Sequence, residues 1–299
     1  MDRSACCRAA CWWTPIAWIR PAASSRMPTS VMNSPEPESP ASCGADMATR
    51  CDRFYGGRFA LLQPQGRGYR SGLDALLLAA TLPATATGRL ADIGAGAGAV
   101  GLAAACRNAA IDVTLVENSP VMADLARRGL ELPANSELAG RLRLVEADIL
   151  AGGTARAAAG LGDGTFGHVL TNPPYHPHDH RISPDPLRAA AMSAADGDFL
   201  ARWVRACAAL LCHGGRFATI VRTDALPTLL AACDGRIGAL RLLAIHARAE
   251  APAPRLLVLG RKGSRAPLSL LPARILHRPD GTLTEFATAV AEGTADLGL

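Results

Sequence analysis

The feature that most constrains the fold is an alternation of strand-like and helix-like segments that begins near Leu90. Short apolar or β-branched runs are separated by segments with helical composition and capping residues. This alternation predicts an α/β fold: a doubly wound, mainly parallel, seven-stranded sheet with helices on both faces. The expected strands are residues 89–93, 112–117, 142–146, 168–171, 217–221, 239–247 and 255–260, and the expected helices include 98–107, one opening at Ser119-Pro120, and 198–212.

Residues 1–48 differ in composition from the rest of the chain. They hold three of the four tryptophans and a Pro/Ser-rich stretch at 35–40, and such a segment is poorly suited to pack as a regular element. We expect a disordered extension or a segment foreign to the fold, with translation starting at Met47. A targeting sequence is less favoured because Pro15 interrupts its short apolar part. Residues 49–299 are expected to form one domain, with an apolar cap helix near 71–82.

Cysteine usage and charge exclude several classes of protein. The nine cysteines are scattered and form no CxxC pair, which argues against a disulfide framework and a zinc site. A reducing, cytoplasmic setting is expected, with no metal. No apolar run reaches the roughly 18–20 residues of a membrane helix, so no membrane partner is expected. The net charge of +5 permits a polyanionic partner without requiring one. No feature indicates an oligomeric state.

A glycine-rich turn follows the first strand of the alternation, in the segment Asp92–Gly98. Its glycines, Gly94, Gly96 and Gly98, let the backbone turn sharply and let a ligand approach the main chain. Glu117 lies at the end of the next strand, 19 residues after Gly98, where a carboxylate can accept hydrogen bonds from two ribose hydroxyls. These features alone also fit a dinucleotide-dependent dehydrogenase.

The spacing Asp-x-Gly-x-Gly-x-Gly, with an acid before the first glycine, resembles motif I of the class I S-adenosylmethionine-dependent methyltransferases. The resemblance implies a Rossmann-like fold and S-adenosyl-L-methionine as the cofactor. It also implies that Asp92 faces the methionine end of the cofactor. In that family an acid after the third strand contacts the adenine amine, and Asp148 matches it. The alternative is that both are turn residues at strand ends.

The most informative stretch is Asn172-Pro173-Pro174-Tyr175, which directly follows the fourth expected strand. Parallel sheets bind ligands at the carboxyl ends of their strands, so this loop is expected to face the same crevice as the glycine turn. Asn-Pro and Pro-Pro are also ordinary turn formers, which is the alternative interpretation.

The residue types of this loop suit methylation of a planar nitrogen. An exocyclic amine or a side-chain amide is a poor nucleophile because its lone pair is delocalised. Two acceptors that each take one N–H favour a pyramidal nitrogen and expose the lone pair. Asn172 offers its side-chain oxygen, and Pro173 offers a carbonyl held still by the fixed φ of proline. Tyr175 can stack on the flat substrate, and the protein mainly has to align donor and acceptor.

The order of these motifs, over roughly residues 53–265, resembles the bacterial tRNA adenine N6-methyltransferases that modify valine tRNA. This resemblance implies RNA, and specifically tRNA, as the partner. It places Asp74 of the cap region near the cofactor, and Asn172 beside both cofactor and substrate. The segment 261–265 resembles the basic C-terminal strand end of that family. The residues expected to contact RNA phosphates are His176, Arg181, Arg188, Arg261, Lys262 and Arg265.

Several alternatives remain. Protein glutamine N5-methyltransferases share Asn-Pro-Pro-Tyr, and the guanine N2-methyltransferases of ribosomal RNA carry a close variant. A cofactor-binding protein with a relict site is a third interpretation, which the intact loop disfavours. A dehydrogenase is least favoured, because nothing after the fourth strand supplies an acid or base for hydride transfer. The spacing of His176, His178 and His180 suggests a metal only weakly, since no acid or cysteine cluster lies nearby.

Overall fold

The computed structural model describes residues 48–65, 72–174 and 198–297. Expectations for the remaining residues lie outside the described part of the chain. These are the N-terminal extension, the start of the cap region, and the site residues Tyr175, His176, His178, His180, Arg181 and Arg188.

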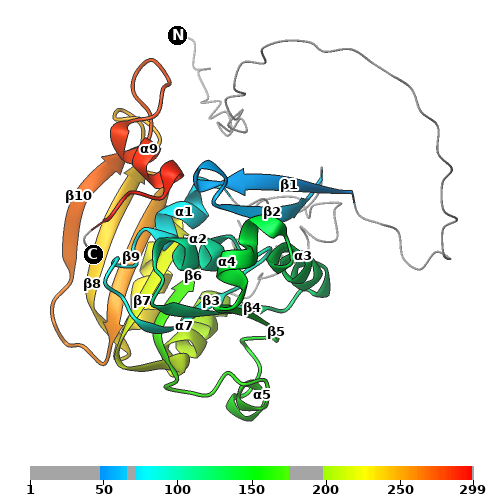
Figure 1. Cartoon of the computed structure of the whole chain (residues 1–299). Coiled ribbons are helices and arrows are strands. Elements are labelled where there is room, and N and C mark those ends of the chain that lie inside the picture. The colour runs from blue at the N-terminus through cyan, green and yellow to red at the C-terminus, as the bar shows by residue number, and fades with distance from the viewer. Residues whose placement is uncertain (1–47, 66–71, 175–197, 298–299) are drawn as a thin grey trace, which may run out of the picture. The chain divides into compact units, whose positions relative to one another are not determined.

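The core of the protein is one eight-stranded sheet with the strand order β10-β8-β9-β7-β6-β3-β4-β5. Strand β10 lies at one end and β5 at the other (Figure 1). Strand β9 is antiparallel to β7 and β8, and the other neighbours pair in parallel. The strands are β3 (Gly88–Ile93), β4 (Ile111–Glu117), β5 (Leu142–Glu146), β6 (Phe166–Thr171), β7 (Leu211–Arg222), β8 (Ile237–His246), β9 (Arg255–Lys262) and β10 (Ser269–Ile275).

The expected doubly wound, mainly parallel sheet is confirmed, but the strand count of seven was wrong. The additional strand is β10, which pairs in parallel with β8. Six of its seven residues are exposed, so it lacks the apolar run that marks a buried strand in the sequence. The helix expected to reach residue 212 ends at Leu210, and Leu211 already pairs with Phe166 across a bulge in the β6–β7 ladder.

Helices cover the sheet on both faces, and each face has its own apolar cluster. One cluster joins α1, α2 and α9 to the sheet, and the other joins α7 and α8. Ser119 caps α3 by accepting from the Met122 amide, and Pro120 opens that helix, as the sequence predicts. The helices are α1 (Leu73–Ala79), α2 (Ala99–Arg107), α3 (Pro120–Leu130), α4 (Ser136–Ala139), α5 (Gly153–Ala158), α7 (Phe199–Leu210), α8 (Leu226–Cys233) and α9 (Glu285–Glu292).

A two-stranded hairpin, β1 (Thr49–Phe54) and β2 (Phe59–Pro64), precedes the sheet and was not anticipated from the sequence. Phe54 and Phe59 stack with ring centroids 5.2 Å apart. The buried side chain of Asn135 bonds to both the amide and the carbonyl of Ala60, so the hairpin is anchored to the segment between α3 and α4. Across the described residues no helix is long and apolar enough to cross a membrane.

Candidate active site

The glycine turn and the Asn172 loop lie on neighbouring strands at the same edge of the sheet. Strands β3 and β6 are parallel, and Ile93 is the register partner of Thr171. Gly94 and Asn172 are the next residues of each strand, and adjacent strands are only about 4.8 Å apart. The expectation that the two loops share one edge is therefore confirmed.

A buried hydrogen-bond chain fixes the spacing between these two loops. The Thr171 hydroxyl donates to the Ile93 carbonyl at 2.8 Å and accepts from Trp203 Nε1 at 2.9 Å. Trp203 of α7 also packs against Gly94, where an added Cβ would lie 3.1 Å from Trp203 Cζ2. Trp203 belongs to no motif of the sequence, and the one signal it carries there is that it is the single tryptophan beyond residue 48.

The glycine turn is held against the end of β4. Gly94, Gly96 and Gly98 have φ values of +72°, +57° and +92°, a region that glycine adopts without strain. The Gly94 amide donates to the Val116 carbonyl at 2.9 Å, and the Gly96 amide donates to Glu117 Oε2 at 2.8 Å. Strand β4 therefore sets the shape of the turn.

Glu117 lies at the end of β4 with 8% of its surface exposed. Its Oε1 accepts from the amides of Asn118 and Ser119, and Oε2 accepts from Gly96. An ionised carboxylate offers about four acceptor sites, so these three bonds leave capacity on Oε2 for a ligand hydroxyl.

Asp92 is buried beside the turn, with 1% of its surface exposed. Its Oδ2 accepts from the Gly101 amide of α2 at 2.8 Å, whereas Oδ1 has no hydrogen-bond partner among the described residues. Burial raises the pKa of Asp92 to about 7, the negative charge of Glu117 adds to the rise, and the bond from Gly101 opposes it. One oxygen thus ties β3 to α2, and the other is an orphaned acceptor at the turn.

The remaining acids predicted to bind the cofactor lie at the same edge. Asp148 follows β5, is exposed, and accepts from the Leu150 amide through Oδ1 at 2.8 Å. Asp74 of α1 pairs with Arg255 of β9, with 3.0 Å between Arg255 Nε and Asp74 Oδ2. Arg255 was not recognised in the sequence, because its partner lies 181 residues away.

The predicted RNA contacts at residues 261–265 lie toward the edge of the sheet opposite the glycine turn. Strand β9 is antiparallel to β7, so Arg255 pairs with Arg222 at the edge of the glycine turn, and Arg261 pairs with Arg216 near the start of β7. The register aligns Thr171 with Thr219 and Val258, so Arg261 lies three residues, about 10 Å, along the strands from the end of β6 and two strands across from it. The structure therefore does not bring the predicted RNA contacts Arg261, Lys262 and Arg265 together with Asn172.

Lys262 has a structural role in the described part of the chain. Its Nζ donates to the carbonyls of Ala209 and Leu211 at 3.3 and 2.6 Å, where α7 joins β7. An ammonium held by two carbonyls at a helix C-terminus stabilises that junction. Its assignment as a phosphate contact gains no support from this geometry.

The family model of the methyltransferase small domain matches residues 71–225. The chain belongs to this family. A solved structure from Agrobacterium tumefaciens, described as a predicted O-methyltransferase, is 37% identical to this methyltransferase. It covers 74% of this chain and 97% of its own chain, with a TM-score of 0.65.

Curated relatives of the methyltransferase carry a more specific name. A tRNA1(Val) (adenine(37)-N6)-methyltransferase from Flavobacteriaceae bacterium (strain 3519-10) is 26% identical over 64% of this chain and 76% of the relative. A protein of the same name from Shewanella putrefaciens is 36% identical over 35% of this chain and 41% of the relative.

The family and the fold establish a class I methyltransferase that uses S-adenosylmethionine. The site fits that cofactor. The orphaned Asp92 Oδ1 can accept from a cationic ammonium, and Glu117 Oε2 retains capacity for a hydroxyl. The family membership excludes the dehydrogenase alternative. Within the described ranges no group of three or more His, Cys, Asp or Glu could hold a metal ion.

Proposed function

We propose that this methyltransferase methylates the exocyclic amine of an adenine in tRNA. The observation that carries the proposal is the pairing of Ile93 with Thr171, because it puts Asn172 beside the glycine turn. The names of the curated relatives support tRNA as the substrate. The sequence Asn-Pro-Pro-Tyr supports a planar nitrogen as the acceptor atom.

In this proposal the Asn172 loop orients the amine. The Asn172 side-chain oxygen accepts one N–H, and the carbonyl of buried Pro173 accepts the other. Pro174 keeps the loop extended, and Tyr175 stacks on the base. S-adenosylmethionine supplies an electrophilic methyl on its sulfonium. The protein contributes alignment and two preorganised acceptors, and it needs no strong general base.

The proposed cofactor contacts follow the edge of the sheet. Asp92 faces the methionine end, Glu117 accepts from the ribose, and Asp148 Oδ2 accepts from the adenine amine. Asp74 lies beside the cofactor from the cap helix. The backbone of the turn Gly94–Gly98 lets the cofactor approach closely. His176, Arg181 and Arg188 follow the loop in sequence and are proposed to contact phosphates around the flipped adenine.

The test is methyl transfer from labelled S-adenosylmethionine to separate pools of tRNA, ribosomal RNA, and ribosomal and release-factor proteins. Label is expected in tRNA and, after digestion to nucleosides, in N6-methyladenosine. The affinity for tRNA should fall steeply with salt, because phosphate contacts release counterions. Label in glutamine, in guanine or on an oxygen atom, with none in adenine, would overturn the proposed substrate.

A further inference from the structure

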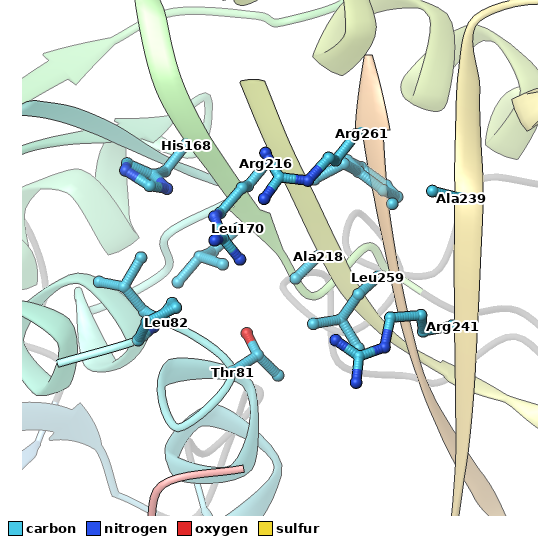
Figure 2. Close-up of a pocket in the computed structure, with 13 residues that line it drawn as sticks. Thr81, Leu82, His168, Leu170, Arg216, Ala218, Ala239, Arg241, Leu259 and Arg261 are labelled. Carbon is cyan, nitrogen blue, oxygen red and sulfur yellow. The ribbon is translucent and has the colours of Figure 1, made fainter. Parts of the chain in front are cut away.

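A pocket of about 400 Å³ lies on the face of the sheet that α1 covers (Figure 2). Its floor comes from β6, β7, β8 and β9, and the segment 81–83 after α1 forms one side. A volume of this size is in the range of small-ligand sites. Three arginines line it, namely Arg216, Arg241 and Arg261, and none of its described lining residues is an acid.

Three of the lining residues form one row across neighbouring strands. His168 on β6 is the register partner of Arg216 on β7, and Arg216 is the register partner of Arg261 on β9. Register partners share a face of the sheet, with about 4.8 Å between strands. Two guanidinium groups, those of Arg216 and Arg261, therefore stand on neighbouring strands of the same face.

Arg241 brings a third guanidinium to the same face. It pairs with Leu259, which lies two residues before Arg261 on β9 and therefore on the same side of the sheet. In Figure 2 Arg216 and Arg261 lie together, and Arg241 reaches in from β8. Burial lowers the pKa of Arg216, and the positive charges of Arg261 and Arg241 lower it further. The three cations are therefore close enough to interact.

His168 adds a buried acceptor at the end of this row. It is 8% exposed, and its Nε2 lies 3.1 Å from the Thr87 carbonyl, which assigns the proton to Nε2. Burial lowers the pKa of His168, with Arg216 and Arg261 acting in the same direction and the Thr87 bond opposing them. Its Nδ1 is buried with no partner among the described residues. A neutral Nδ1 accepts a hydrogen bond from a hydroxyl.

We propose that this pocket binds a phosphoryl group, with the arginines donating to its oxygens and His168 Nδ1 accepting from a hydroxyl on it or beside it. Planar guanidinium groups match phosphate geometry and give strong, charge-assisted hydrogen bonds. Hydrogen phosphate carries such a hydroxyl, and an RNA phosphate has a ribose 2′-hydroxyl beside it. The ligand is therefore a backbone phosphate of RNA or a free phosphorylated molecule.

With RNA as the source, the inference rests on the proposed function. Arg216 lies three residues before Thr219, the register partner of Thr171, so the row is about 10 Å along the strands from the Asn172 edge. This separation is comparable to the spacing of one or two nucleotides in an extended strand. The pocket would then hold a phosphate close to the methylated base rather than the base itself.

The first arm of the test measures phosphate binding. Sodium phosphate is titrated against sodium chloride at equal ionic strength, with thermal unfolding and calorimetry as readouts. The variants are Arg241→Gln and Arg216→Gln, and the control is Arg205→Gln, an exposed arginine of α7. Phosphate should raise the Tm of the wild type and of Arg205→Gln. Phosphate affinity should fall roughly tenfold or more in Arg241→Gln, since a charge-assisted bond is lost.

The second arm identifies the source of the phosphate by measuring tRNA binding to the same proteins. Weaker tRNA binding by Arg241→Gln, with competition by phosphate, supports an RNA backbone phosphate. Unchanged tRNA binding with lost phosphate binding supports a free phosphorylated ligand. The proposal is overturned if phosphate acts no differently from chloride on the wild type and Arg241→Gln binds tRNA normally. Failure of methyl transfer to tRNA contradicts only the proposed function, since the phosphate titration does not depend on it.

Discussion

Ile93 and Thr171 are register partners on parallel strands, and each is the last strand residue before a loop of the active site. The Thr171 hydroxyl links the Ile93 carbonyl to the Trp203 indole inside the protein. The distance between the glycine turn and the Asn172 loop is therefore set by the packed sheet and α7. A site built on rigid elements in this way holds donor and acceptor in a fixed relation.

Thr171→Val tests the buried hydrogen-bond chain. The substitution keeps the shape of the side chain but leaves the Trp203 Nε1–H, which is buried, without its acceptor. We expect the free energy of unfolding to fall by about 1–3 kcal/mol in chemical denaturation. The control is Thr165→Val, since the exposed Thr165 also bonds through its hydroxyl, to the Gly162 carbonyl. An equal loss in the two variants would contradict a special role for Thr171.

Asp92→Asn tests the raised pKa of the buried carboxyl through the pH dependence of stability. Asp92 titrates near pH 4 when unfolded and at about 7 when folded, so between these values only the folded protein holds the proton. The contribution of Asp92 to stability should therefore fall as the pH rises from about 4 to about 7, by at most about 1.4 kcal/mol per pH unit. Above that window it should be constant.

The measurement for Asp92 is chemical denaturation of both proteins across that pH range. The free energy of unfolding of the wild type minus that of Asp92→Asn isolates the contribution of Asp92, because the other groups titrate in both proteins. A difference that does not change with pH would contradict the raised pKa. The cationic cofactor favours the ionised carboxylate, so saturating S-adenosylmethionine should shift the window to lower pH.

Arg255→Met tests whether the ion pair with Asp74 holds the cap helix in place. The two side chains are 23% and 15% exposed, so the pair is partly screened and is worth roughly 1 kcal/mol or less. We expect the Kd for S-adenosylmethionine to rise by up to about fivefold in calorimetry. Arg222→Met is the control, because Arg222 is exposed at the same edge and pairs with Asp224. Matching Kd values in the two variants would argue against a role for Arg255.

Much of the α/β core was predictable because its signals are local. Strands β3, β4, β5 and β6 each carry apolar or β-branched residues in short runs between turn signals. The Ser119-Pro120 pair marks the start of α3 in the sequence itself. The glycine turn and the Asn172 loop could be predicted to lie at one edge, because the carboxyl ends of parallel strands meet at the same edge of a sheet.

The missed features depend on contacts between distant residues or on the direction of a strand. The Asp74–Arg255 pair and the Trp203–Thr171 bond have no local sequence signature. The antiparallel direction of β9 put Arg261 at the far edge, which the composition of the strand does not reveal. The phosphate pocket is likewise visible only once the register sets His168, Arg216 and Arg261 side by side.

The most direct test of the central claim compares Asn172→Ala with the wild type for methyl transfer from labelled S-adenosylmethionine to tRNA, alongside calorimetric binding of the cofactor. Loss of a preorganised acceptor should lower turnover by about 100-fold or more, while the Kd for the cofactor stays within about twofold. Asn172→Asp retains an acceptor and should keep more activity than Asn172→Ala. Turnover by Asn172→Ala equal to that of the wild type would contradict the account.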